Sequence, residues 1–235
     1  MPTLTLNTYI EDFTNLFFPK LCLACNKSPV VRDEITCVRC QYELAVQENY
    51  KDKENDMMQA FWGRVPLEMI TSMYTFVEKG RVRNLVHQLK YRNQKNIGIA
   101  LGKTFGKKLA KVSDFESVDV IVPVPLHPRK ERKRGYNQSE AFGQGLAESM
   151  QKSHLAKGLK RVIHKTSLTR KSRDVRFESI KDAYEVREKK KLAGKHILLV
   201  DDVLTTGATI EACARKLLQL PGVKLSIAVI AQGEL

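Results

Sequence analysis

Apolar residues along the chain follow two spacings, one typical of helices and one typical of buried strands. Residues 82–89 and 97–109 carry apolar side chains at helical spacing, so each segment predicts an amphipathic helix. Residues 118–122 and 196–200 are short apolar runs rich in branched side chains, which predicts strands buried in a sheet. Residues 223–231 form a similar run and predict the closing strand.

Further helices and a pair of strands complete the predicted core. Asn137 followed by Glu140 is a capping-box pattern, which predicts that a helix begins there. Residues 210–218 predict another helix, and the basic segment 157–191 predicts two short strands around a mobile loop. Strands that alternate with helices are typical of a doubly wound parallel sheet, so we expect an α/β fold.

The N-terminal quarter has a different pattern. Residues 1–18 predict a short helix, residues 20–42 contain four of the five cysteines, and residues 47–60 are polar and aperiodic, which predicts a linker. We therefore divide the chain into an N-terminal part, residues 1–60, and an α/β domain, residues 61–235.

The charge is distributed unevenly between these two parts. The chain has a formal net charge of +14, and residues 1–60 hold six basic and nine acidic residues, so residues 61–235 carry +17. A field of this strength attracts polyanions such as nucleic acid, phosphorylated substrates or acidic lipid. The alternative is a basic surface that serves only solubility.

The sequence gives no sign of a membrane or secretory protein. No run approaches the roughly 18 consecutive apolar residues that a membrane-spanning helix needs. The N-terminus contains Glu11 and Asp12, without the basic start and long apolar run of a signal peptide. We expect a cytoplasmic protein without membrane insertion.

Four cysteines form two Cys-x-x-Cys pairs separated by eleven residues: Cys22, Cys25, Cys37 and Cys40. Four thiolates suit a closed tetrahedral zinc site, and cytosolic clusters are more often metal sites than disulfides. A redox pair needs only one Cys-x-x-Cys, and an iron–sulfur cluster is the remaining alternative. Cys213 lies on the apolar face of the last predicted helix and is interpreted as a core residue.

Two acids and a loop of small residues stand at the end of the 196–200 strand, in the sequence Asp-Asp-Val-Leu-Thr-Thr-Gly-Ala-Thr. Ligands of open parallel sheets bind just beyond the carboxyl ends of the strands. Small residues before a helix let backbone N–H groups surround a phosphate, and Gly207 fits a positive φ. Asp201 and Asp202 can accept hydrogen bonds from vicinal sugar hydroxyls, which predicts a sugar phosphate as ligand.

The sequence of this loop also allows other interpretations. The segment lacks both the P-loop pattern G-x-x-x-x-G-K-[ST] and the dinucleotide pattern G-x-G-x-x-G. An ordinary strand-to-helix turn that begins with Asp is the alternative.

A second candidate anion site follows the 118–122 strand, at the same predicted edge of the sheet. It contains five cations within six positions: Arg129, Lys130, Arg132, Lys133 and Arg134. These are enough to neutralise a pyrophosphate, although a solvated run of charge is the usual alternative. His127 lies in the same segment and is interpreted as an ordinary loop residue more readily than as a ligand contact.

The ordered set of motifs resembles the ComF family, a competence-associated, phosphoribosyltransferase-like family linked to DNA uptake. The motifs, after the paired cysteines, are Leu-Lys-Tyr-Arg (89–92), Val-Pro-Val-Pro-Leu-His-Pro-Arg (122–129), Arg-Gly-Tyr-Asn-Gln (134–138) and the loop at 197–209. The resemblance covers about 20–42 and 80–231. It implies a type I phosphoribosyltransferase-like parallel sheet flanked by helices, with a small N-terminal zinc module.

The loop itself resembles the phosphoribosyl pyrophosphate (PRPP) signature of type I phosphoribosyltransferases. The resemblance implies that Asp201 and Asp202 hold the ribose 2′ and 3′ hydroxyls and that the following loop holds the 5′-phosphate. The loop residues are Thr205, Thr206, Gly207, Ala208 and Thr209. It also implies Mg²⁺ bound with PRPP, bridging pyrophosphate and ribose hydroxyls.

Residues 165–176 correspond by the same resemblance to the flexible loop that closes over PRPP. ComF members usually have Gln-Thr here and Arg-x-x-Asn shortly after, whereas this chain has Leu168-Thr169 and Arg176-Phe-Glu-Ser179. Both differences remove an amide side chain and leave the charge intact, so the resemblance does not establish catalysis.

The sequence is therefore compatible with two functions of different class. A binding protein would bind PRPP and single-stranded DNA and act in DNA uptake with other competence proteins. Its candidates for stacking on bases are Tyr91, Tyr136 and Phe177. An enzyme of nucleotide metabolism or salvage would displace pyrophosphate from PRPP with the nitrogen of an unidentified base or amine. Its expected catalytic residues are Asp201, Asp202, Arg129 and Lys165.

Overall fold

A parallel sheet of five strands forms the centre of the protein, which confirms the predicted α/β fold. The computed structural model describes Thr14 and residues 17–30, 34–44, 46–77, 80–91, 94–162 and 183–233. In spatial order the strands are β1 (Met69–Thr75), β7 (Lys224–Gln232), β6 (His196–Leu204), β2 (Val120–Pro123) and β3 (Ser153–His154). A separate antiparallel pair consists of β4 (Leu159–Arg161) and β5 (Tyr184–Val186).

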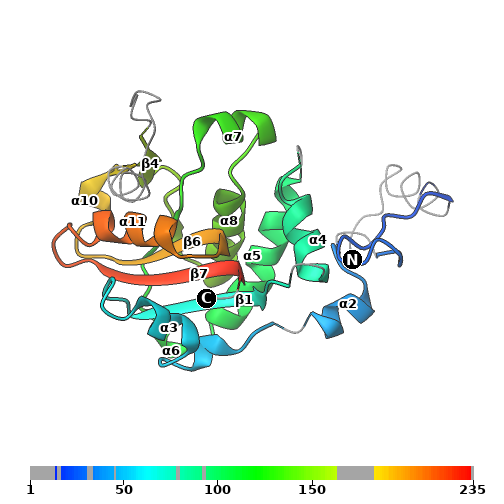
Figure 1. The fold of residues 1–235 in the computed structure, drawn as a ribbon, viewed down its shortest axis with the longest axis horizontal. Coiled ribbons are helices and arrows are strands. Elements are labelled where there is room, and N and C mark those ends of the chain that lie inside the picture. The colour runs from blue at the N-terminus through cyan, green and yellow to red at the C-terminus, as the bar shows by residue number, and fades with distance from the viewer. Residues whose placement is uncertain are drawn as a thin grey trace, which may run out of the picture.

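Helices surround this sheet, and α4, α5, α8 and α11 among them are the ones that the sequence pattern predicts (Figure 1). They are α2 (Val38–Glu43), the 3-10 turn η1 (Asn49–Lys51), α3 (Asp56–Phe61), α4 (Arg81–Gln88), α5 (Lys95–Leu109), α6 (Ser113–Glu116), α7 (Pro128–Arg134), α8 (Gln138–Met150), α10 (Lys189–Leu192) and α11 (Ala208–Leu217). The predicted cap of α8 is present, because the Asn137 side chain accepts a hydrogen bond from the Ser139 N–H at 3.1 Å. None of the helices in the described ranges has the length and apolar character needed to cross a bilayer.

Strand β6 is buried on both faces, and each face has its own core. Ile197 and Leu199 pack with residues of α11 and β4–β5. Leu198 and Val200 pack on the opposite face with residues of α5 and α8. Because successive side chains of a strand alternate between faces, a strand covered on both sides needs an unbroken apolar run.

Helices α5 and α8 touch backbone to backbone. A Cβ atom on Gly102 would overlap the carbonyl oxygen of Phe142, and one on Gly145 would overlap the carbonyl oxygen of Ile99. The two glycines therefore permit a helix spacing that no larger residue allows. This contact fixes α8, whose first turn contributes to the site described below.

The segment 47–60, predicted to be a linker, instead packs on the sheet. Tyr50 and Met57 are buried, and the Asn49 side-chain amide oxygen accepts a hydrogen bond from the Thr71 hydroxyl of β1 at 2.6 Å. The linker prediction is wrong because η1 and α3 are too short to show a clear period. The helix predicted within 1–18 lies almost wholly outside the described residues.

The cysteine segment lies beside α4, at the end of the molecule far from α10 (Figure 1). Asn84 of α4 donates a side-chain hydrogen bond to the carbonyl oxygen of Ala24, at 2.8 Å, and Arg81 forms an ion pair with Glu43 of α2. The buried cysteines Cys22, Cys37 and Cys40 belong to the same apolar core as α4 and α5. The segment is thus attached to the α/β domain by both polar and apolar contacts.

Candidate functional site

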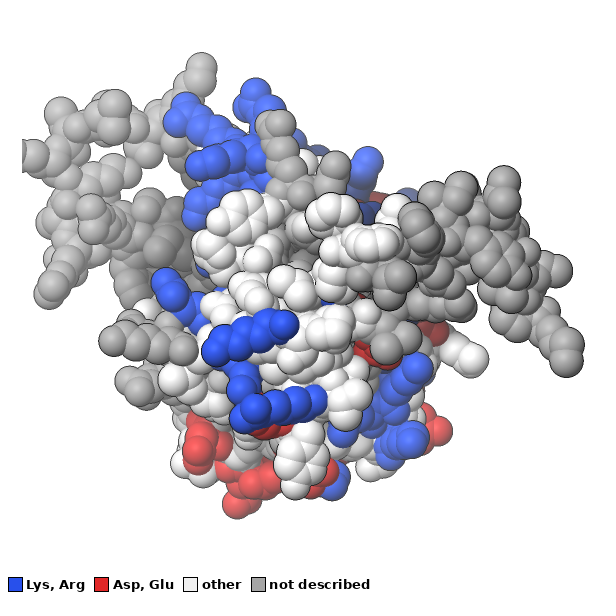
Figure 2. All heavy atoms as spheres, turned by 90° about the vertical axis from the view of Figure 1, so that its right-hand side faces the viewer, with Lys and Arg blue, Asp and Glu red and all other residues white. Residues whose placement is uncertain are grey.

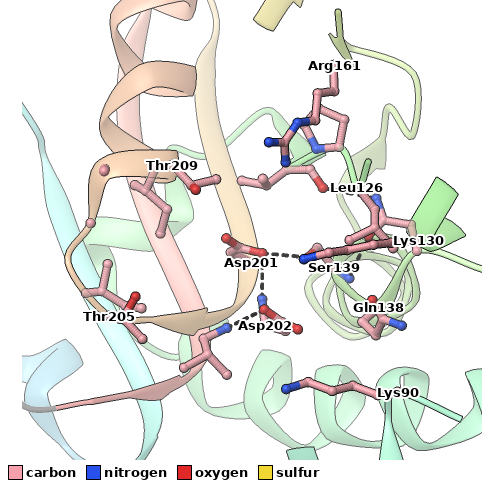
Figure 3. A pocket seen from close by; sticks show the side chains of 18 of the residues that line it. Lys90, Leu126, Lys130, Gln138, Ser139, Arg161, Asp201, Asp202, Thr205 and Thr209 are labelled. Carbon is pink, nitrogen blue, oxygen red and sulfur yellow. Dashed lines mark hydrogen bonds between the residues drawn. The ribbon is translucent and has the colours of Figure 1, made fainter. Parts of the chain in front are cut away.

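A cavity of about 270 Å³ lies at the carboxyl edge of the sheet, between the loop after β6 and the segment after β2 (Figure 3). The predicted residues Asp201, Asp202, Thr205, Thr206, Gly207, Ala208 and Thr209 all line it. From the other side it is lined by Val124, Pro125, Leu126, Lys130, Arg134, Asn137, Gln138 and Ser139. The adjacent pairing of β6 with β2 brings these two segments together, as expected for parallel neighbours.

The two acids are held by short hydrogen bonds. Strand β6 extends to Leu204, so both acids belong to its last residues instead of following it. The Ser139 hydroxyl donates to Asp201 Oδ1 at 2.8 Å, and the Asp202 N–H donates to the same oxygen at 2.9 Å. Asp202 Oδ1 accepts from the Val203 N–H at 2.7 Å. These bonds orient both carboxyl groups at the cavity, as Figure 3 shows.

The carboxyl group of Asp201 is costly to ionise. Asp201 lines the cavity but is only partly exposed, so its carboxyl is largely removed from bulk water. Burial, followed by the neighbouring Asp202 charge, raises the pKa of Asp201 to about 7, against the opposing effect of the Ser139 hydrogen bond. A site of this kind gains from a ligand that brings positive charge or hydroxyl donors to the carboxylate.

The loop after β6 has the backbone geometry expected of a phosphate cradle. Gly207 has φ +75° and caps the N-terminus of α11, which confirms the predicted positive φ. The ten-residue helix α11 begins at Ala208, so its free N–H groups and positive dipole end face the cavity. The arrangement suits an anion bound to backbone N–H groups.

Cations from three elements line the cavity: Lys90 after α4, Lys130 and Arg134 of α7, and Arg161 of β4. Lys90 and Arg161 lie at opposite ends of the view in Figure 3, with the two acids between them. Four cations around two acids leave the lining positively charged overall. Such a lining complements a ligand with several phosphate groups.

The basic run 129–134 is a helix, α7, instead of the loop that the sequence suggested. Residues four apart share one face of a helix, so Lys130 and Arg134 reach the cavity together. Arg129, predicted to be catalytic, is exposed and is not among the residues that line the cavity. Its backbone N–H donates instead to His127 Nδ1 at 3.2 Å, so His127 caps α7.

Several lining residues were not singled out from sequence. Ser139 and Gln138 come from the first turn of α8, and Lys90 and Arg161 are distant in sequence from both loops. Lys90 belongs to the motif at 89–92 and Gln138 to the motif at 134–138, and these motifs were the only signals for them. Lys165 and the rest of 163–182 lie outside the described residues.

The three aromatic candidates for base stacking have different surroundings. The Tyr136 hydroxyl donates to the carbonyl oxygen of Leu89, so this side chain joins the start of α8 to the end of α4. Tyr91 is half exposed and makes an edge contact with the His87 ring. Phe177 lies outside the described residues.

The four predicted metal ligands come together in space. The Sγ atoms of Cys22, Cys25, Cys37 and Cys40 all lie within 4.8 Å of one another. Backbone hydrogen bonds from Ser28 and Lys27 lower the pKa of Cys25 to about 6, which favours its thiolate. The cluster can hold a metal ion. Cys213 lies on the buried face of α11 and is fully buried, as predicted for a core residue.

Replacing the buried acid should change the pH dependence of stability. Asp201 has a folded pKa of about 7, above its ordinary value near 3.9, so the stability it contributes below pH ~4 is lost as the pH rises through 7. Asp201→Asn removes this loss and keeps an oxygen that accepts from Ser139. We therefore compare the free energy of unfolding of the variant with that of wild type at each pH. The variant's free energy minus that of wild type should be roughly 2–3 kcal/mol larger at pH 8 than at pH 5, measured by denaturant unfolding.

Asp119→Asn is the matched control. The Asp119 carboxylate accepts from the His196 N–H, which lowers the pKa of Asp119, so it stays ionised from pH 5 to pH 8. Its substitution should shift stability equally at both pH values. A pH-independent effect of Asp201→Asn would contradict the assignment of a raised pKa to that carboxyl.

Comparison with known proteins agrees with this geometry. Residues 131–234 match the family described as phosphoribosyl transferase domain, a range that contains both acids and the whole loop. The DNA utilization protein YhgH of Salmonella typhimurium is 32% identical over 138 residues, which are 57% of this chain and 60% of that protein.

Two competence proteins show similar identity. Competence protein F of Haemophilus influenzae is 29% identical over 58% of this chain and 61% of that protein. Competence protein ComFC of Bacillus subtilis is 29% identical over 63% of this chain and 57% of that protein. The chain thus matches about three fifths of the length of each of these relatives. These similarities confirm the resemblance to ComF proteins, and residues 131–234 are similar to phosphoribosyl transferase domains.

Proposed function

We propose that this protein binds PRPP together with Mg²⁺ in the cavity at the carboxyl edge of the sheet. The observation that carries the proposal is the placement of two adjacent acids beside a glycine-capped helix N-terminus, within one cavity. A simple phosphate site needs the N–H groups but not the acids. A ribose phosphate uses both, because its vicinal hydroxyls donate to carboxylates while its phosphate accepts from N–H groups.

The remaining lining residues fit the pyrophosphate group. Lys90, Lys130, Arg134 and Arg161 supply the cations. Mg²⁺, a hard cation with oxygen ligands, would add further positive charge next to the acids. The raised pKa of Asp201 fits this role, since a cation at the carboxylate replaces the proton that burial favours.

We propose further that the protein binds single-stranded DNA and acts in DNA uptake. The names of the competence proteins F and ComFC support this role, as does the charge of +17 on residues 61–235. Figure 2 shows Lys and Arg side chains at the top of this face, near the height of α7, and others across its middle and lower right, while acidic side chains lie mostly along the lower edge. Basic side chains spread over one face suit the backbone of a nucleic acid.

An active phosphoribosyltransferase is the second candidate. Four cations around one cavity would stabilise a departing pyrophosphate, which is the main electrostatic demand of PRPP chemistry. A nitrogen nucleophile would form a bond to the anomeric carbon as the bond to pyrophosphate breaks. The differences at Leu168 and Ser179 from the usual ComF pattern weigh against this candidate.

We propose that the cysteine cluster holds one structural zinc ion. Zinc–sulfur bonds of about 2.3 Å place the four sulfurs of a tetrahedral site about 3.7 Å apart, and the four Sγ atoms of this cluster all lie within 4.8 Å of one another. With four thiolates no position is left for substrate, so the role is structural. The buried ligands share a core with α4 and α5, which ties the metal to the stability of the domain boundary.

Metal analysis tests the zinc proposal. The purified wild-type protein should contain about one zinc per chain, and Cys40→Ser should lose it and unfold the cysteine segment, because metal binding supplies folding free energy to small modules. Cys213→Ser changes a buried cysteine in the other apolar core, outside the cluster, and should keep its zinc. Absence of zinc, or the presence of iron with sulfide, refutes the assignment.

Isothermal titration tests the PRPP proposal. Asp201→Asn combined with Asp202→Asn should abolish measurable binding of PRPP in the presence of Mg²⁺ while the protein stays folded. The control Asp114→Asn with Asp119→Asn removes the same number of carboxylates outside the cavity and should bind PRPP as wild type does. Equal affinity of wild type and the cavity double variant would rule out the proposed site.

Salt dependence tests the DNA proposal. Phosphate contacts release counterions, so the affinity for single-stranded DNA should fall steeply with salt and depend little on sequence. Neutralising Arg170, Lys171 and Arg173, chosen from sequence, should flatten the log–log slope by about 2, at roughly 0.7 for each phosphate that is no longer neutralised. The control removes the same amount of charge by neutralising Lys107, Lys108 and Lys111, at the end of α5 and just after it. This control should leave the slope unchanged.

Fluorescence anisotropy at low and physiological salt supplies these slopes. If affinity at physiological salt is no better than that of an unrelated protein of equal charge, the DNA role is wrong.

A further inference from the structure

The end of α3 and the segment that joins it to β1 pack against the outer side of the phosphate loop, the loop formed by residues 205–209. A Cβ atom on Gly207 would lie 2.7 Å from Cζ of Phe61, so the Phe61 ring covers Gly207 directly. The Arg64 guanidinium stacks on that ring at 4.7 Å from its centroid. Gly207 is therefore required for two independent reasons, its positive φ and the ring beside it.

Arg64 joins this segment to both the loop and helix α11. Its Nη2 donates to the carbonyl oxygen of Thr206 at 3.2 Å. Its Nε and Nη2 also donate to one carboxylate oxygen of Glu211, in the first turns of α11, at 2.9 and 2.7 Å. Nη1 donates to the carbonyl oxygen of Ala60 at 3.3 Å, which anchors the guanidinium to α3.

The partner carboxylate is itself held in place. The Glu211 side chain is largely buried and forms a second ion pair with Arg215 of α11 through its other oxygen. Burial raises the pKa of Glu211, but the hydrogen bonds from Arg64 and Arg215 outweigh it and lower the pKa, so Glu211 is ionised at neutral pH. Hydrogen bonds between charged groups of fixed geometry are strong, so the position of Arg64 is well determined.

The bond from Arg64 to Thr206 determines where the next N–H group points. In a trans peptide the carbonyl oxygen and the following N–H lie on opposite sides of the chain. Fixing the Thr206 carbonyl toward Arg64 therefore directs the Gly207 N–H away from Arg64. Gly207 lines the cavity, so this N–H is directed to the side on which an anion would bind.

We propose that Arg64 is a positioning residue, which orients the phosphate loop for the 5′-phosphate of a ribose phosphate from outside the cavity. Arg64 is not among the residues that line the cavity and would not touch the ligand. The inference rests on the proposed function, since it assumes that a ribose phosphate binds this loop. It assigns a role in ligand binding to a segment that precedes the first strand of the sheet.

Two partial ligands separate this role from a general loss of structure. Ribose 5-phosphate reports on the phosphate loop, and inorganic pyrophosphate reports on the cations on the other side of the cavity. Arg64→Ala should weaken ribose 5-phosphate binding about tenfold, the loss expected for one misdirected hydrogen bond to a charged group, and leave pyrophosphate binding unchanged. Dissociation constants come from titration calorimetry, with thermal unfolding as the check that each variant is folded.

Arg215→Ala is the matched control, because Arg215 pairs with the same Glu211 carboxylate but lies beyond the loop on α11. It should bind both ligands as wild type does. If Arg64→Ala does not fold, Arg64→Lys serves instead, since a single ammonium cannot reproduce the three-way contact and should show the same selective loss.

The outcomes distinguish this proposal from the proposed function. Unchanged ribose 5-phosphate affinity in the Arg64 variant, or an equal loss for both ligands, overturns the positioning role while PRPP binding by wild type stands. A wild-type protein that binds neither PRPP nor ribose 5-phosphate overturns the proposed function, and the positioning role with it.

Discussion

The burial of strand β6 on both faces is the constraint on which the rest of the structure depends. Its alternating side chains enter two cores, one with α5 and α8 and one with α11, and its neighbours are β2 and β7. A strand held in this way has a fixed register, because a shift by one residue would exchange the two faces. The position of its last residues, Asp201 and Asp202 among them, is therefore fixed relative to the segment that follows β2.

The same burial that fixes the acids makes one of them unfavourable as an anion. Two carboxyl groups at adjacent positions repel each other, and the enclosed Asp201 has a raised pKa as a result of burial and of this repulsion. Such a pair adds no stability to the fold, so it indicates a ligand that stabilises the two carboxylates. The surrounding cations, Lys90, Lys130, Arg134 and Arg161, and the α11 N-terminus would complement the phosphate groups of the ligand proposed above.

Sequence predicted the parts of the structure whose signals are local. Strands β2, β6 and β7 and helices α4, α5, α8 and α11 have clear apolar patterns and were located from sequence, although β6 extends four residues beyond its predicted end, to Leu204. The loop residues 205–209 are contiguous in sequence, and all of them line the cavity. The packing of 47–60 was missed because its elements are short, and the helical phase of α7 was missed because an all-charged run has no apolar period. Arg64 and Arg161 reach the loop or the cavity only through tertiary packing, which no local pattern reports.

A crystal structure of the protein with PRPP and Mg²⁺ tests the central claim most directly. The account predicts the 5′-phosphate against the N–H groups of residues 205–209, the ribose hydroxyls on Asp201 and Asp202, and the pyrophosphate toward α7 and Arg161. Electron density for the ligand at another place, or a ribose turned away from the two acids, would contradict it.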